Sequence, residues 1–320
     1  MTTDTLFTDS SDLPDIVNAL AVSPRFEEDG ICFAARTSGL YRSDDGGRSW
    51  QPTYGSLELA APLATMAVAV SPAFDADHRL FAGVNGGVLR SLDGGTTWSA
   101  AILASPEPLV TALAISPDFA YDGVVLAGTM EDGVFRSADR GSSWAPWNFG
   151  LLDLNILSLA ISPNFARDET LFAGTESGLF RSTNGGRAWR EVDFPTEFAP
   201  VLSLALSPDY AGDGVLFVGT EFHGLFSTDD RGGTWKRRGE GVMDTAVNAV
   251  ILSSDFPSRP DVLVLLSNML LISRDGGASW SEWKPGLRFE ESTASIAAPH
   301  GLGPGAPLLV GLVEGGVVRL

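Results

Sequence analysis

The sequence predicts an all-β fold, a single seven-bladed β-propeller whose blades are four-stranded antiparallel sheets. A tryptophan recurs at intervals of 48, 46, 45, 46 and 45 residues. A Ser-Pro segment and an apolar Leu-Phe-Ala-Gly-Thr segment, each with variations, recur in step with it. The chain also holds 36 glycines and 19 prolines, which implies many turns. A fixed period in this range is typical of solenoids and propellers.

Each repeat contains four short apolar runs that predict strands. The first precedes Ser-Pro, as in 201–206; the second is the Leu-Phe-Ala-Gly-Thr run, as in 171–175. The third is the Gly-Leu-Phe-Arg-Ser run, as in 178–182, and the fourth begins at the tryptophan. These runs are rich in Val, Leu, Phe and Ile, and Gly, Pro or Asp separates them. No segment keeps a helical apolar stripe, so four strands per repeat of about 45 residues predict a propeller blade.

The seventh repeat ends after three predicted strands, near 293–298, 308–312 and 316–320. In five of the six complete repeats the tryptophan lies 19 residues before the next Ser-Pro proline or its equivalent. The same spacing before Pro24 leads to Thr5, so Thr5–Phe7 is predicted to be the outer strand that closes blade seven. The predicted boundaries are 1–15 for the closing strand and 16–53, 54–101, 102–147, 148–192, 193–238, 239–283 and 284–320 for the blades.

The composition excludes several classes of protein. The net charge is −19, with 40 acidic and 21 basic residues, so the surface repels phosphate backbones and anionic membranes. We therefore expect no nucleic-acid partner, and no apolar run is long enough for membrane insertion. The acidic N-terminus lacks the basic start and apolar run of a secretory signal, and Cys32 is the only cysteine. Unless a leader was removed, the predicted location is cytoplasmic.

A short polar motif precedes each tryptophan. It reads YRSDDGGRSW at Trp50 and recurs five times, ending with FRSTNGGRAW and FSTDDRGGTW among others. This S-x-D-x-G-x-[ST]-W pattern resembles the Asp-box, or BNR repeat, of sialidases, sortilin-type receptors, xyloglucan-cleaving glycosidases and photosystem II assembly factors. The resemblance implies a propeller but no single function, because the motif occurs in enzymes and non-enzymes. The predicted structural box residues are Asp45, Trp50, Asp93, Trp98, Asp139, Trp144, Asn184, Trp189, Asp230, Trp235, Asp275 and Trp280.

Six copies of one motif cannot be six active sites, so we assign the boxes to the fold. The aspartates are expected to accept backbone N–H bonds and close the turn between the third and fourth strands. The tryptophans are expected to anchor between blades. The fourth repeat carries Asn184 and Ala188 in place of Asp and a hydroxyl residue, and its turn is expected to survive because Asn also accepts such bonds.

A binding site is expected on the opposite face, where the second-to-third strand turns and the crossings between blades lie. In the resembling enzymes that face holds the active site. Arg36 is the only cation in the turns that line the channel mouth. Aromatic residues beside charges in two crossings are typical of protein-contact anchors or of packing between blades. The candidate binding residues are Asn85, Glu131, Asp132, Glu176, Glu221, Phe222, His223, Glu314, Trp147 and Trp283.

Several chemical alternatives were weighed on these residues. A sialidase would need three arginines to hold a carboxylate, which an acidic mouth with one arginine does not offer. Glu131, Glu176 and Glu221 could pair as glycosidase carboxylates, but they are also equivalent residues of a repeated turn. Carboxylates suit Ca²⁺ or Mg²⁺, although no spacing defines a metal site. Repeated arginines before the boxes could attract an anionic partner, or pair with acids of neighbouring blades, which we favour.

These observations predict a non-enzymatic scaffold that binds another protein, possibly within a multi-protein complex. No cofactor, no metal site and no catalytic residue is predicted. The alternative is a carbohydrate-active enzyme, a glycoside hydrolase, or a lectin that uses the acidic channel mouth to bind carbohydrate.

Overall fold

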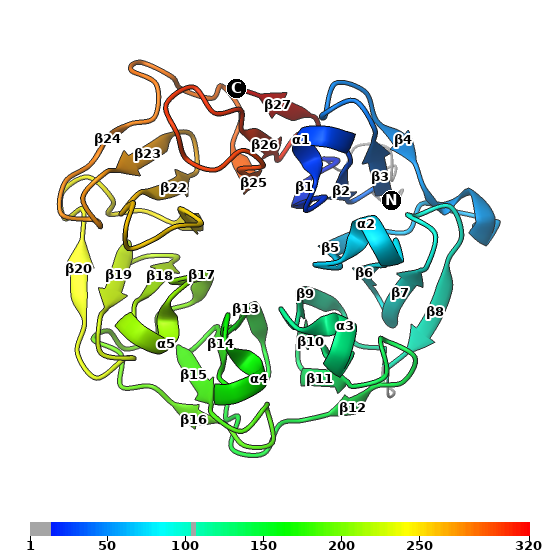
Figure 1. Ribbon diagram of the computed structural model, residues 1–320, viewed down its shortest axis with the longest axis horizontal. Helices are drawn as coiled ribbons and strands as arrows, with labels where there is room; N and C mark the ends of the chain where they lie inside the picture. Colours follow the sequence, from blue (N-terminus) through cyan, green and yellow to red (C-terminus); the bar gives the residue numbers. More distant parts are fainter. Residues whose placement is uncertain (1–13, 104–106) are drawn as a thin grey trace, which may run out of the picture.

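Seven antiparallel sheets form a ring around a central axis in the computed structural model, which describes residues 14–103 and 107–320 (Figure 1). Six sheets have four strands, and the seventh has three among the described residues. The prediction of a seven-bladed propeller is therefore confirmed. The predicted closing strand, Thr5–Phe7, lies outside the described residues.

Each blade runs from an inner strand at the axis to an outer strand at the rim (Figure 1). The inner strands are β1 (Val17–Val22), β5 (Thr65–Val70), β9 (Val110–Ile115), β13 (Ile156–Ile161), β17 (Val201–Leu206), β21 (Val247–Leu252) and β25 (Thr293–Ala297). The second strands are β2 (Cys32–Arg36), β6 (Leu80–Val84), β10 (Val125–Thr129), β14 (Leu171–Thr175), β18 (Leu216–Thr220), β22 (Val262–Leu266) and β26 (Leu309–Leu312). The second strands are buried almost throughout, because neighbouring blades cover both faces.

The third strands are β3 (Gly39–Ser43), β7 (Gly87–Ser91), β11 (Gly133–Ser137), β15 (Leu179–Ser182), β19 (Leu225–Thr228), β23 (Leu270–Ser273) and β27 (Val317–Arg319). The fourth strands are short and exposed: β4 (Gln51–Pro52), β8 (Ser99–Ile102), β12 (Ala145–Pro146), β16 (Arg190–Glu191), β20 (Lys236–Arg238) and β24 (Ser281–Glu282). They begin directly after the tryptophans rather than at them.

One-turn helices follow the inner strands of the first five blades. They are α1 (Phe26–Asp29), α2 (Phe74–Asp77), α3 (Phe119–Asp122), α4 (Phe165–Asp168) and α5 (Tyr210–Asp213), and a 3₁₀ helix, η2 (Tyr54–Leu57), follows β4. Each of the five begins with a buried aromatic ring. In blade 1, Ser23 Oγ donates to Asp29 Oδ2 over 2.6 Å and also accepts the Arg25 N–H, so the Ser-Pro segment closes the turn that holds this ring.

A belt of hydrogen bonds near the axis joins successive inner strands, and the sequence analysis did not anticipate it. A polar side chain near the start of one inner strand donates to the carbonyl of the first residue of the next. In ring order the donors are Asn18, Thr111, Ser158, Ser203, Asn248 and Ser295, and their acceptors are the carbonyls of Thr65, Ile156, Val201, Val247, Thr293 and Val17. The Ser295 bond, at 2.7 Å, joins blade seven to blade one.

The glycine of the second-strand marker has a steric cause. At Gly174, a Cβ atom would lie 2.5 Å from Cγ1 of Val201, the first residue of the next inner strand. The same overlap, at 2.5 or 2.6 Å, exists for the other glycines of this set: Gly83, Gly128, Gly219 and Gly311. The blades therefore approach so closely that only hydrogen fits at this position.

Candidate functional site

The two ends of the ring differ in what they carry. Because strands within a blade alternate in direction, the box turns and the one-turn helices lie at one end, which we call the box face. The second-to-third strand turns and the crossings between blades lie at the other end, which we call the crossing face.

The box of blade 1 shows what its conserved-looking pattern of side chains does. Ser43 Oγ donates to Asp45 Oδ1 over 2.8 Å and accepts the Gly47 N–H over 2.9 Å. Asp45 also accepts the N–H groups of Arg48 and Ser49, and Ser49 Oγ donates to its second oxygen. The aspartate therefore satisfies the backbone of the turn, as the sequence predicted.

These hydrogen bonds favour the ionised carboxylate. A hydrogen bond from the Ser143 hydroxyl is the largest cause that lowers the pKa of Asp139 to about 2. Thr228 has the leading role at Asp230, and Ser279 at Asp275, whose pKa values are also lowered to about 2. Such carboxylates are permanently charged near neutral pH, and their acceptor sites are occupied by the turn, so they are structural groups rather than general acids.

The box of blade 4 keeps its turn despite its altered residues. Asn184 Oδ1 accepts from Ser182 Oγ and from the Ala188 N–H, both at 2.9 Å. Ser182 Oγ again accepts a glycine N–H, that of Gly186. This confirms the expectation that Asn substitutes for Asp. The cost is one bond to the second carboxylate oxygen, which Ala188 could not make.

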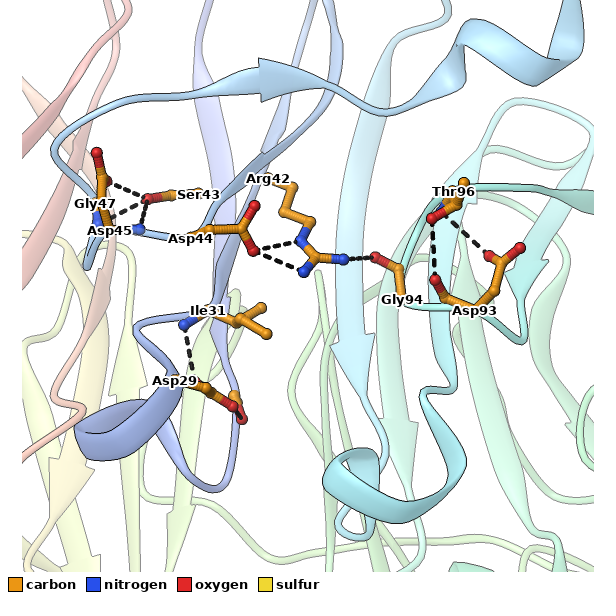
Figure 2. Close-up of polar contacts among 11 residues, drawn as sticks. Asp29, Ile31, Arg42, Ser43, Asp44, Asp45, Gly47, Asp93, Gly94 and Thr96 are labelled. Atoms are coloured by element: carbon orange, nitrogen blue, oxygen red, sulfur yellow. Dashed lines mark hydrogen bonds and ion pairs between the residues drawn. The ribbon is translucent and has the colours of Figure 1, made fainter.

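The arginines before the boxes join neighbouring blades through backbone carbonyls. Figure 2 shows Arg42 between two boxes: its Nη1 donates to the Gly94 carbonyl of blade 2, and its other nitrogens pair with Asp44 of its own blade. Arg181 donates to the Arg231 carbonyl over 2.7 Å. The predicted pairing with Asp29, Asp77, Asp122, Asp168 or Asp213 is wrong, because these carboxylates accept bonds from serines of their own blades.

Arg136 departs from this series. Its guanidinium lies 4.4 Å from the centre of the Trp147 ring, and that of Arg187 lies 5.7 Å from the same ring. Burial is the largest cause that lowers the pKa of Arg136. Trp147 is half-buried in this stack, and Trp283 is half-buried in the apolar cluster between blades six and seven. Both candidate anchors therefore take part in packing between blades.

The crossing face brings two of the predicted carboxylates into one network. Asn155, in the crossing to blade 4, accepts the Glu131 N–H with its side-chain oxygen and donates to Glu176 Oε2, both over 3.0 Å. Asp153 in the same crossing accepts the Ser177 N–H. The sequence analysis did not select Asn155 or Asp153, because a crossing residue that joins two turns carries no local sequence signal.

The remaining candidates lie in separate turns of the crossing face. Asn85 and Glu314 are exposed, whereas Asp132, Glu221 and His223 are half-buried. Phe222 is 62% exposed between the last two. No group of three or more His, Cys, Asp or Glu side chains suited to hold a metal ion occurs among residues 14–103 and 107–320.

Comparisons with known proteins agree with the boxes and the ring. A family model described as BNR/Asp-box repeat matches residues 41–52. The chain is a seven-bladed propeller built from Asp-box repeats. No curated protein matches its sequence.

Solved structures share the fold of this Asp-box propeller at low sequence identity. A GH74 xyloglucanase from Xanthomonas campestris is 20% identical with a TM-score of 0.73, over 96% of this chain and 52% of the enzyme. The extracellular domain of the one-component system BT4673 from B. thetaiotaomicron is 16% identical with a TM-score of 0.70, over 96% of this chain and 38% of that one. YCF48 bound to a D1 peptide is 15% identical with a TM-score of 0.69, over 96% and 94% of the two chains.

Exposed apolar side chains of the Asp-box propeller gather on its crossing face. Ten large apolar residues are exposed among the described residues. Seven of them lie in crossings or second-to-third strand turns: Leu59, Phe149, Leu152, Leu154, Phe198, Phe222 and Val242. Leu92 and Tyr121 lie on the box face. Within the described part of the chain, no helix is long and apolar enough to span a membrane.

Proposed function

We propose that this propeller is a non-enzymatic platform that binds another protein through the crossing face of blades 3 to 5. The supporting observation is a surface on which exposed apolar side chains alternate with carboxylates. Phe149, Leu152, Phe198 and Phe222 are 62–80% exposed there, which is unusual for neighbouring loops of a water-soluble surface. Large apolar side chains are what fill the desolvated centre of protein interfaces.

The charge of this surface indicates the kind of partner. Five loops form it, at 130–133, 147–155, 176–178, 193–200 and 221–224, and none contains Lys or Arg. Their carboxylates include those of Glu131, Glu176, Glu197 and Glu221. A cavity of about 570 Å³ opens beside Phe198 and is lined by Glu191, Asp193 and Glu197 as well. A basic segment with apolar residues is the partner that this surface complements.

YCF48, which shares the fold over the full length of both chains, is solved with a D1 peptide bound. That complex supports a peptide-binding role for a single seven-bladed Asp-box ring. The GH74 enzyme supports the carbohydrate alternative less directly, because this chain spans only about half of it.

The test is purification of the tagged protein from its own host, followed by mass spectrometry of what accompanies it. We expect a stoichiometric protein partner that dissociates at high salt. The double variant Phe198→Ser, Phe222→Ser should lose it. Tyr121→Ser is the matched control, because Tyr121 is 90% exposed but lies on the box face.

Two results would overturn the platform proposal. One is purification alone at full yield, or loss of the partner in the Tyr121 variant as much as in the double variant. The other is hydrolysis of a glycan such as xyloglucan by the purified chain, abolished by Glu176→Gln or Glu221→Gln, which would establish the enzyme instead.

We also propose that Thr5–Phe7 is the fourth strand of blade seven. In blades 3 and 4 the next inner strand starts ten positions after the fourth strand ends, from Pro146 to Ile156 and from Glu191 to Val201. Ten positions before Val17 is Phe7. The pairing of Phe135 with Pro146 then predicts that Phe7 faces Val318.

Paired cysteines test this closure. In a Cys32→Ala background, Phe7→Cys and Val318→Cys should form a disulfide, whereas Phe7→Cys with Arg90→Cys, a third-strand position of blade 2, should not. Deletion of residues 1–10 should lower the melting temperature. An unchanged melting temperature together with no disulfide would refute this closure.

A further inference from the structure

A crevice on the box face, between blades 4 and 5, contains a buried hydroxyl group without a partner. Two cavities of about 280 and 460 Å³ lie there, and both are lined by Arg181, Thr183 and Arg231. The smaller cavity is also lined by Tyr210, which is 2% exposed. The Tyr210 hydroxyl makes no hydrogen bond with the described residues, an arrangement that is costly unless a ligand or water satisfies it.

The walls of this crevice supply positive charge. Arg181 and Arg231 each spend one side-chain N–H on a carbonyl, that of Arg231 and that of Ala211 respectively. Neither forms an ion pair with any acid among residues 14–103 and 107–320. A guanidinium has five N–H donors in a planar fork, so most of this donor capacity is available to a ligand. Arg190 lines the larger cavity as a third guanidinium.

The carboxylates of the crevice are mostly occupied. Asp168, in the smaller cavity, accepts Ser162 Oγ over 2.7 Å and the Thr170 N–H over 2.9 Å. Asp230 accepts the bonds of its own box. Glu191 and Asp193 line only the larger cavity and are exposed to solvent. The inner part of the crevice is therefore the part that favours an anion.

The junction between blades 2 and 3 is an internal control for this crevice. It has the same two arginines, with Arg90 Nη1 donating to the Arg140 carbonyl as Arg181 does to that of Arg231. However, Phe119 stands where blade 5 has Tyr210, Asp93 where blade 4 has Asn184, and Ser99 where it has Arg190. The junction of blades 4 and 5 thus differs by one added hydroxyl, one added guanidinium and one carboxylate replaced by a neutral amide.

We propose that the crevice between blades 4 and 5 binds a phosphate group, as the free anion or as a phosphomonoester. The forked donors of Arg181 and Arg231 suit a tetrahedral oxyanion, and the Tyr210 hydroxyl adds a directional donor. Asn184 matters because an aspartate at this position would add a negative charge beside the ligand. The site is independent of the crossing face and its protein partner.

The proposal is tested by isothermal titration of the purified full chain with inorganic phosphate and, separately, with phosphoserine. Sodium chloride of equal ionic strength serves as the reference in parallel thermal melts. Tyr210→Phe should weaken phosphate binding about tenfold, because a hydrogen bond to a charged group is lost. It should leave the melting temperature without phosphate unchanged, since Phe119 holds the equivalent place in blade 3.

Matched variants separate a built site from general charge. Arg231→Gln and Asn184→Asp should each weaken binding at least about tenfold, whereas Arg140→Gln, the equivalent change in blade 3, should have no effect. Tighter binding of phosphoserine than of phosphate would assign the site to an ester, and the reverse to the free anion. No heat of binding at millimolar phosphate, or an equal loss in the Arg140 and Arg231 variants, would overturn the proposal.

Discussion

The junction of blades 2 and 3 and the junction of blades 4 and 5 are built on the same backbone bonds. In both, an arginine of the third strand donates to a carbonyl of the next box. In both, two aromatic rings meet edge to face with centroids 5.9 Å apart, Phe81 with Phe119 and Phe172 with Tyr210. What differs is the set of side chains that line the space beside these bonds.

The comparison teaches that the interblade contacts depend on main-chain acceptors and on close approach. A carbonyl acceptor is present whatever the side chain, so the arginine keeps its partner in both junctions. The lining residues are then able to change without opening the ring. The two junctions also differ near the axis, where Ser158 of blade 4 donates to the Val201 carbonyl but Ala67 of blade 2 has no group to donate.

The largest expected effect is steric and should be common to both junctions. Gly174→Ala would place Cβ 2.3 Å from Ser158 Oγ and 2.5 Å from Val201 Cγ1, and Gly83→Ala would place it 2.6 Å from Val110 Cγ1. We expect each to destabilise the protein by about 1–3 kcal/mol, and Gly174→Ala more. The measurement is the midpoint of denaturant unfolding. Ala35→Gly, at the position that tolerates alanine, is the control; a neutral Gly174→Ala would contradict the packing argument.

A second, smaller effect should distinguish the junctions. Ser158→Ala removes the belt bond between blades 4 and 5 and should cost about 1 kcal/mol. Ala67→Ser should instead add the missing bond to the Val110 carbonyl and stabilise the protein by about 0.5 kcal/mol. Both are measured by thermal unfolding. Equal and opposite signs are expected, and destabilisation by both would show that blade 2 has no room for a hydroxyl.

A third prediction concerns acid. The double variant Asn184→Asp, Ala188→Ser should restore the hydroxyl-to-carboxylate bond of the other boxes and stabilise the protein by about 0.5–1 kcal/mol at pH 7. A box carboxylate whose folded pKa is about 2 lies below its unfolded value of about 3.9. Its contribution is present above pH 4 and is lost as the pH falls through 2. Melting curves at pH 7 and pH 2.5 check this; a gain of equal size at both values would be contrary to it.

The smallest expected effect is that of Tyr210→Phe on stability. Burial raises the pKa of Tyr210, and its hydroxyl has no hydrogen-bond partner in the described protein, so the loss should change the unfolding free energy by about 0.5 kcal/mol or less. A loss of more than about 1 kcal/mol would mean that the hydroxyl already bonds within the protein. Thermal melts in phosphate-free buffer give this value.

Much of the fold followed from the repeat itself. The tryptophan spacing gave the number of blades, and the alternation of apolar runs with turn residues gave the four strands. Box chemistry was also predictable, because Ser43, Asp45 and Gly47 act on one another over a few residues. The arginine partners were predicted wrongly, since charge in the sequence points to acids while the blade geometry offers carbonyls. The candidate binding residues of the crossing face stay a prediction, strengthened by the exposed apolar side chains around them.

The sequence by itself determined the blade, the box and the ring, because each rests on contacts between residues close in the chain or on a regular period. Only the tertiary structure decided what happens between blades. The fit of Gly174 against Val201, the belt bond of Ser295 to Val17 and the unpartnered Tyr210 hydroxyl all depend on residues from different repeats. A repeat fixes its own strands through local geometry, but the distance between two blades is set by every side chain that packs between them, and no local pattern records that sum.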